Sequence, residues 1–188
     1  MYKFNIVGSD NKDIIKKDSA NIKYLMNQIW HSGKSQKFSP DNIYILCEEE
    51  EGSFVGGAFL QKLNLHQIQD DLRELVSTLP LDGYVLQCNG IYFNRALTRT
   101  STQNASSDYY CRSFYSGLYK SLIELGRIKG VSFITIKISS ESYELTKEFG
   151  SWPYVVELKP HHSCDGYFYG ILPLTGTQCE VYQTFCKG

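Results

Sequence analysis

The sequence predicts a single domain of the α/β (α+β) class. A chain of 188 residues that is 42% hydrophobic can bury one full core, and no Pro- or Gly-rich linker divides it. A strand, a connecting loop, a long amphipathic helix and a second strand follow one another between residues 84 and 138. Between residues 43 and 60, two shorter strands flank an acidic turn, which is typical of an antiparallel hairpin. These observations predict helices packed on one sheet.

The first part of the chain alternates strands and short helices. Residues 1–7 have the composition of a first strand, and Ser19 is a plausible N-cap for the helix that follows. That helix carries an apolar stripe at helical spacing: Ile22, Leu25, Met26, Ile29 and Trp30. The hairpin strands are predicted over 43–47 and 54–60, and Asn64 is predicted to cap a short helix that extends to Val76.

The second part contains the longest helix. A strand is predicted over 84–93, and the helix after it has a stripe of Phe114, Leu118, Leu122, Leu125 and Ile128 that ends at Gly130. Residues 131–138 are rich in Val, Ile and Phe, as in a strand buried on both faces. A helix over 141–149 and strands over 154–158, 167–172 and 181–185 complete the expected elements.

Composition and charge exclude several classes of function. The net charge is −1, and lysine and arginine are scattered along the chain, so an electrostatic footprint for nucleic acid or for an anionic membrane is missing. No apolar run approaches the roughly 20 residues of a membrane span, and the first residues lack the apolar core of a signal peptide. We therefore expect a soluble, cytoplasmic protein without nucleic-acid or membrane partners.

The cysteines favour a reduced protein without a metal. Cys47 and Cys88 lie in apolar strand segments, where a free thiol behaves as a small hydrophobe. A tighter cluster contains His161, His162, Cys164 and Asp165, but it lacks the ligand spacing of a zinc site. Of the two interpretations, a zinc site and a polar turn between strands, we favour the turn.

The start of the long helix carries a family resemblance. Residues 112–117 read Arg112, Ser113, Phe114, Tyr115, Ser116 and Gly117. This segment and the order of elements resemble the GNAT acyltransferase superfamily, in which a Q/R-x-x-G-x-G/A pattern opens the helix that binds the pyrophosphate of coenzyme A. The first and last positions fit, Tyr115 replaces the middle glycine, and Ser113 and Ser116 supply hydroxyl donors. Taken alone, the segment favours the ordinary start of a helix, and the order of the surrounding elements favours the phosphate-binding interpretation.

The resemblance implies a fold, a reaction and a site. It implies a central mixed, mostly antiparallel sheet flanked by helices, and an N-acyltransferase, most simply an acetyltransferase, that moves an acyl group from acetyl-CoA or another acyl-CoA to an amine by direct attack. The thioester would lie along Ile91, Tyr92 and Phe93, and the pyrophosphate on residues 112–117. No metal is implied. The usual catalytic tyrosine position holds Thr146, so Tyr143, one helical turn earlier, is the candidate acid; a tyrosine that merely packs on the sheet is the competing interpretation.

Two alternatives follow from departures from the family pattern. The polar stretch 94–111 has the composition of a long insertion loop and is similar to that of acyl-homoserine-lactone synthases, which take acyl groups from acyl carrier protein and use S-adenosylmethionine as the amine. The strand centre, Gln87 to Asn89, has no carboxylate to serve as a base. That absence favours a third hypothesis, a non-catalytic acyl-CoA-binding or protein-interaction module.

Overall fold

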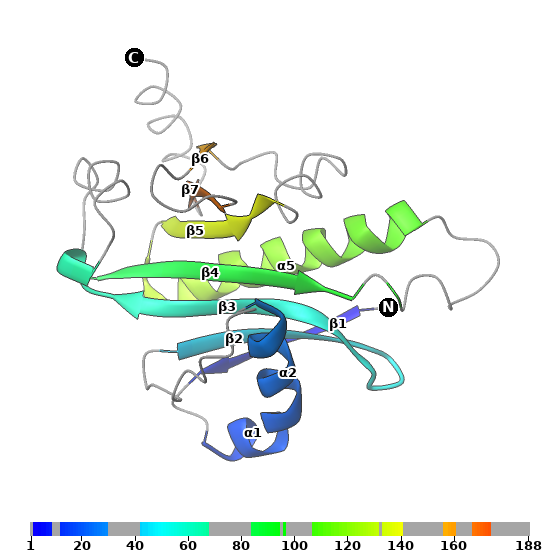
Figure 1. The fold of residues 1–188 in the computed structure, drawn as a ribbon. Coiled ribbons are helices and arrows are strands. Elements are labelled where there is room, and N and C mark those ends of the chain that lie inside the picture. Colours follow the sequence, from blue (N-terminus) through cyan, green and yellow to red (C-terminus); the bar gives the residue numbers. More distant parts are fainter. Residues whose placement is uncertain are drawn as a thin grey trace.

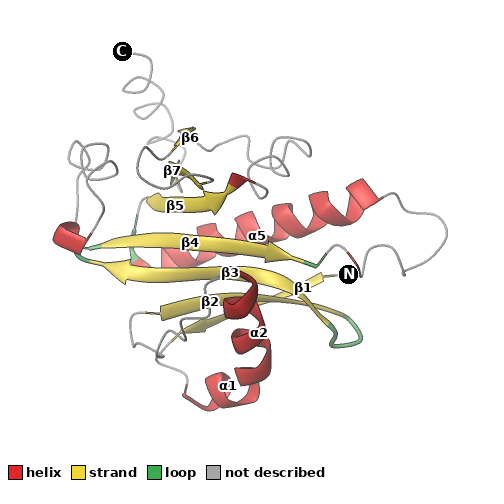
Figure 2. Ribbon diagram, in the orientation of Figure 1, coloured by secondary structure: helices red, strands yellow, loops and turns green. Residues whose placement is uncertain are grey.

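The computed structural model describes residues 2–8, 12–29, 42–67, 84–94, 96, 107–131, 133–140, 156–160 and 167–173. The described strands form one seven-stranded sheet in the order β1-β2-β3-β4-β5-β7-β6 (Figure 1). Only the pair β4–β5 is parallel, and the other neighbouring strands are antiparallel. The prediction of a mixed, mostly antiparallel sheet flanked by helices is therefore confirmed (Figure 2).

The N-terminal strands form an antiparallel meander. Strands β1 (Tyr2–Gly8), β2 (Asn42–Glu49) and β3 (Phe54–Leu63) pair in sequence order. The turn between β2 and β3 contains Gly52 with a φ of 84°, a conformation that glycine adopts without the strain of a side chain. The expected hairpin is confirmed, and both of its strands are longer than the apolar runs alone indicated.

Two short helices cover one face of this meander. Helix α2 (Ser19–Ile29) matches the predicted apolar stripe, with Ile22 and Leu25 fully buried, whereas helix α1 (Lys12–Lys17) was not predicted. The stripe continues to Trp30, which lies outside the described residues. After β3, a single 3-10 turn, η1 (Leu65–Gln67), is described where a helix to Val76 was expected, and the rest of that segment lies outside the described residues.

The opposite face is covered by the longest helix. Strand β4 (Val85–Phe93), helix α5 (Ser107–Lys129) and strand β5 (Phe133–Ser139) form the predicted strand, helix, strand unit. Gly130 follows the last residue of α5 and closes the helix, because it adopts a φ of 67° and its N–H donates to the Arg127 carbonyl. Strand β5 is buried at four successive residues, from Phe133 to Ile136, as expected of a central strand.

The last described strands extend the sheet beyond β5. Strand β7 (Tyr167–Pro173) pairs with β5 and is followed at the edge by β6 (Val156–Pro160), close to the predicted ranges. The helix expected over 141–149, the strand expected over 181–185 and the cluster from His161 to Asp165 lie outside the described residues.

Each face of the sheet has its own apolar core. The larger core lies between the sheet and α5 and contains Phe114, Leu118 and Leu122. The smaller core lies between the sheet and α2 and contains Leu25, Tyr44 and Phe59. Cys47, Cys88 and Cys111 are buried thiols that form no disulfide among the described residues, which confirms the prediction of reduced, buried thiols for Cys47 and Cys88.

Candidate active site

The centre of the sheet contains a β-bulge where the parallel pairing ends. On the β3 side, Phe59 pairs with Gly90 but Leu60 pairs with Cys88, so Asn89 is the extra residue. On the β5 side, the recorded pairs run from Leu86 to Cys88 and stop there. Strand β4 continues to Phe93, and beyond the bulge β4 and β5 turn away from each other (Figure 1). The bulge and the end of the recorded parallel pairing therefore fall at the same place, at the centre of the sheet.

Helix α2 reaches the bulge with its C-terminal end. A Cβ on Gly90 would meet the side chain of Ile29, the last residue of the helix. One turn earlier, the Tyr24 hydroxyl lies 3.3 Å from that of Tyr92, and the two rings meet edge to face at 5.9 Å. Because the C-terminal end of a helix carries a partial negative charge, α2 favours a cationic or hydrogen-donating group beside the bulge.

Amide side chains line the same face at the bulge. Gln87 donates from Nε2 to Asn89 Oδ1 at 2.6 Å, and Asn89 donates from Nδ2 to Gln61 Oε1 at 3.4 Å. These three residues can orient a ligand by hydrogen bonds, but none of them can accept a proton as a general base. Proton removal from a bound amine would therefore fall to water or to a residue outside this group.

The predicted cofactor segment of β4 directly follows the bulge. Ile91 and Phe93 are buried towards α5, and Tyr92 lies on the α2 face. Burial, followed by the hydrogen bond to Tyr24, raises the pKa of Tyr92 well above its ordinary value, so its hydroxyl remains protonated at neutral pH. Burial also raises the pKa of the Cys88 thiol, next to the bulge, to about 12, so that thiol is not a nucleophile at neutral pH.

The predicted helix start at residues 112–117 is wrong. Helix α5 begins at Ser107, so these residues lie in its second and third turns, where backbone N–H groups bond within the helix. Phe114 and Tyr115 are buried in the larger core, and Gly117 packs against the ring of Phe4. Packing in the core explains both the buried ring of Tyr115 and the close contact of Gly117 with Phe4. The cofactor role of this segment remains a prediction.

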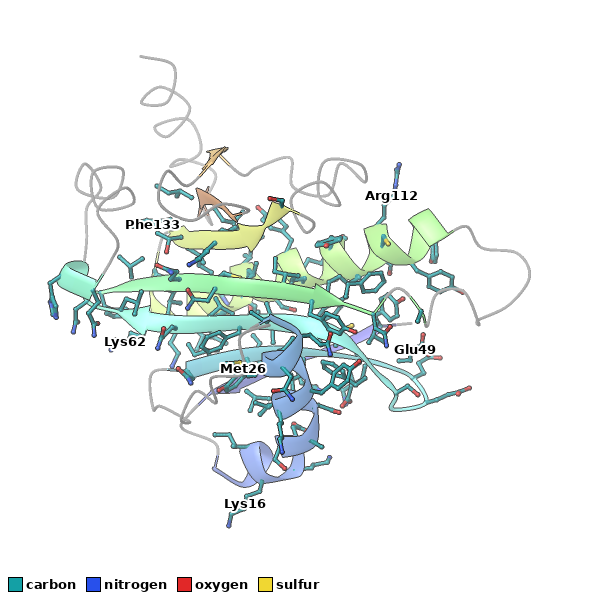
Figure 3. The ribbon with its side chains drawn as sticks, in the orientation of Figure 1. Lys16, Met26, Glu49, Lys62, Arg112 and Phe133 are labelled. Carbon is teal, nitrogen blue, oxygen red and sulfur yellow. The ribbon has the colours of Figure 1, made fainter. Side chains whose placement is uncertain are left out.

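Arg112 differs from its neighbours because it is exposed. Figure 3 shows its side chain extending from the N-terminal part of α5 away from the strands. Ser116, one turn later, is also exposed, and Ser113 is half-buried. Phe93 at the end of β4 packs on Phe114 with ring centroids 4.6 Å apart, so the end of β4 lies beside the third turn of this helix. The predicted acid, Tyr143, lies outside the described residues.

Sequence reasoning missed two features of the site. The bulge at Asn89 was not predicted, although an isolated glycine within a strand, here Gly90, is a known signal for one. The first five residues of α5 were assigned to the polar insertion 94–111, although Tyr109 and Tyr110 precede the helix stripe directly. Residues 97–106 of that insertion lie outside the described residues.

Comparison with solved structures identifies the fold. An N-acetyltransferase from Staphylococcus aureus Mu50 is 13% identical, with a TM-score of 0.50 over 93% of this chain and 98% of that one. BjaI, a CoA-dependent acyl-homoserine lactone synthase solved with SAM and isopentyl-CoA, is 10% identical, with a TM-score of 0.56 over 100% of this chain and 90% of that one. FeeM, an N-acyl amino acid synthase from uncultured soil microbes, is 10% identical, with a TM-score of 0.55 over 93% and 92%.

The chain thus has the fold of GNAT-type acyltransferases, as the resemblance implied. Compared by sequence, it matches no protein-family model and no curated protein. Among the described helices, none is both long and apolar enough to cross a membrane.

Proposed function

We propose that this protein is an N-acyltransferase that moves an acyl group from a CoA thioester to an amine, with acetyl-CoA as the simplest donor. The observation that carries the proposal is the coincidence of the bulge at Asn89 with the last parallel pair, Cys88 and Ile136. The bulge and the end of the parallel pairing both interrupt the regular strand ladder at the centre of the sheet. A thioester arm can lie between the two strands there. The similar folds named above include enzymes that act on acyl-CoA.

The thioester arm is proposed to follow β4 beyond the bulge, along Ile91, Tyr92 and Phe93. Strand backbone that leaves its ladder can hydrogen-bond an extended ligand in place of a neighbouring strand. A backbone N–H directed at the carbonyl oxygen would stabilise the negative charge that develops as the amine attacks. This role requires a fixed backbone, which the flanking pairs with β3 supply.

The pyrophosphate is proposed to lie at the first turn of α5 rather than at residues 113–117. The first four N–H groups of a helix lack partners within it, and together with the helix dipole they favour a phosphate group. In α5 the first of these groups belong to Ser107, Asp108 and Tyr109. Arg112, exposed one turn later, would supply a positive charge.

The proposed chemistry is direct transfer. The amine nitrogen attacks the thioester carbon, the new C–N bond forms, and the C–S bond breaks to release CoA as a thiolate. The nitrogen loses a proton to water or a neighbouring base, and the thiolate gains one, for which Tyr143 remains the proposed donor. The three amides at the bulge orient the amine in this scheme but do not exchange its proton.

A longer acyl donor is the second candidate. The synthases named above, BjaI and FeeM, give higher TM-scores than the acetyltransferase does, and BjaI was solved with isopentyl-CoA. A synthase of that kind could take its acyl group from CoA or from acyl carrier protein. Comparing acetyl-CoA with octanoyl-CoA and octanoyl acyl carrier protein separates these donors.

Calorimetric titration with acetyl-CoA tests the proposal. Arg112→Glu should weaken binding at least ~10-fold, because it replaces a charge-assisted contact to phosphate by repulsion. Lys120→Glu is the matched control, since it makes the same charge change at an exposed position two turns later on α5. S-acetylpantetheine, which lacks the pyrophosphate, should bind both variants alike. If the wild type binds neither acyl-CoA nor acyl carrier protein thioesters, the proposal fails.

A further inference from the structure

The buried polar side chains of the described core lie in one row. Among the described residues, the buried polar or charged ones are Asn42, Gln87 and Thr135. Asn42 pairs with Gln61, Gln61 with Gln87, and Gln87 with Thr135, so the row crosses β2, β3, β4 and β5 in direct register. Residues directly opposite each other on paired strands lie on the same face, and their side chains are neighbours.

This polar row lies on the face that α2 covers. Tyr44, two residues after Asn42, belongs to the core under α2, and Ile134 and Ile136 on either side of Thr135 belong to the core under α5. The next row along the strands contains Tyr44, Phe59 and Gly90. A Cβ on Gly90 would meet Ile29, the last residue of α2. The polar row therefore lies just beyond the C-terminal end of α2.

One member of the row lacks part of its hydrogen bonding. Asn42 is 3% exposed and donates from Nδ2 to the Tyr44 hydroxyl at 3.2 Å, but its Oδ1 has no hydrogen-bond partner in the part of the chain that the structure describes. Turning the amide over would pair Oδ1 with the hydroxyl and leave Nδ2 without a partner. A buried amide group without a partner is destabilising, and a bound polar group would recover that loss.

We propose that the polar row of Asn42, Gln61, Gln87 and Thr135 binds the amine substrate through uncharged hydrogen-bonding groups, such as hydroxyls, next to the reacting nitrogen. The carboxamides offer both donors and acceptors, and the Thr135 hydroxyl, which donates to the Leu86 carbonyl at 3.3 Å, offers an acceptor. None of these groups is charged, so they match hydroxyl groups rather than an apolar chain. Asn89, hydrogen-bonded to Gln61 and Gln87, connects the row to the bulge. The inference rests on the proposed function because it assigns the second substrate of the same site.

The chemistry of the row also indicates how strongly it should discriminate. A site built to hydrogen-bond a substrate leaves its own buried groups unpaired when an apolar analogue binds, and such sites discriminate strongly. Glucosamine and cyclohexylamine are a suitable pair of probes, because both present a primary amine on a six-membered ring and only glucosamine has hydroxyls. We expect the wild type to prefer glucosamine in kcat/KM, with an acyl-CoA as donor.

Variants of the row test the assignment. Gln61→Met and Gln87→Met keep side-chain length but remove the amide, and each should lower the ratio of kcat/KM for glucosamine over cyclohexylamine at least ~10-fold. Gln67→Met, on the exposed turn η1 outside the row, is the control and should leave the ratio unchanged. Taking the ratio of the two amines removes any effect of the variants on acyl-CoA binding. A ratio unchanged in both row variants overturns the inference.

Binding and stability measurements separate this inference from the proposed function. Saturation-transfer NMR of glucosamine with the wild type and Gln61→Met needs no acyl transfer, and a signal that the variant loses supports the row even if no amine is acylated. If other amines are acylated but glucosamine neither binds nor reacts, the inference fails and the proposed function stands. Asn42→Leu should keep or raise the midpoint of chemical unfolding. A lower midpoint, together with an unchanged ratio of kcat/KM for glucosamine over cyclohexylamine, would make Asn42 a structural residue and overturn its assignment to the row.

Discussion

Gly117 lies directly against the ring of Phe4, across the contact between helix α5 and the edge strand β1. A Cβ at position 117 would overlap the ring atoms, and Phe4 is held in place by Phe114, whose ring centroid lies 5.9 Å away. The glycine therefore sets how closely the helix approaches the sheet. Its position in the sequence suggested a phosphate-binding loop, but its contacts explain it as a packing residue.

Replacing this glycine should reveal the contact with Phe4. Gly117→Ala should lower the free energy of unfolding by ~1–3 kcal/mol through overpacking, partly offset by the better helix propensity of alanine. In a Phe4→Leu background, where the ring is absent, the same change should be neutral or stabilising. Chemical denaturation of the four proteins of this cycle gives the coupling energy. Equal effects in both backgrounds would show that Phe4 does not restrict position 117.

Gly57 should be intolerant of substitution for a different reason. A Cβ there would meet the Ile45 carbonyl oxygen on the neighbouring strand β2, and backbone in a sheet cannot move aside as a side chain can. Gly57→Ala should therefore destabilise the protein by more than ~2 kcal/mol, measured by urea denaturation. Shortening the nearby Leu25 should not rescue the variant; rescue by Leu25→Ala would mean that the helix rather than the strand is the obstacle.

Buried thiols should make stability fall at alkaline pH. Burial raises the pKa of Cys88 from 9.0 to about 12, and burial together with Glu48 and Glu49 does the same for Cys47. Because the folded pKa lies above the unfolded value, this stability is fully present below pH 9.0 and is lost as the pH rises towards 12. Each thiol should contribute a slope of up to ~1.4 kcal/mol per pH unit in that window.

The Cys47→Ala/Cys88→Ala double variant isolates this effect. Its free energy of unfolding, measured by denaturation at several pH values between neutral and alkaline, should decline less steeply than that of the wild type. Tyr44 and Tyr92, whose pKa values are also raised by burial, keep a residual slope in both proteins. Parallel pH dependences would show that the two thiols titrate normally.

The hydroxyl pair of Tyr24 and Tyr92 predicts a specific titration behaviour. Burial is the main cause of the raised pKa of Tyr92, and the hydrogen bond to Tyr24 adds to it. In Tyr24→Phe, the pKa of Tyr92 should fall but stay above its ordinary value, as followed by ultraviolet absorbance of tyrosinate. A Tyr92 pKa that returns fully to the ordinary value would identify the hydrogen bond, not burial, as the dominant cause.

Much of the fold was predictable because burial leaves a periodic signal. The stripe of Ile22 and Leu25 located α2, and the apolar run after Gly130 located β5. The start of α5 was missed because serines and aspartate at a helix start have the same composition as a loop. The bulge at Asn89 was missed because one extra residue hardly changes an apolar strand pattern that is judged over nine residues.

The spacing of apolar residues in the sequence determined most of the strands and helices, because it decides which face of an element is buried, and the family resemblance implied a mixed sheet flanked by helices. Only the tertiary structure decided that the parallel ladder ends at Cys88 and Ile136, that Gly117 serves packing, and that Asn42, Gln61, Gln87 and Thr135 form one row. The physical reason is that register between strands depends on contacts between residues far apart in the chain, which no local pattern records.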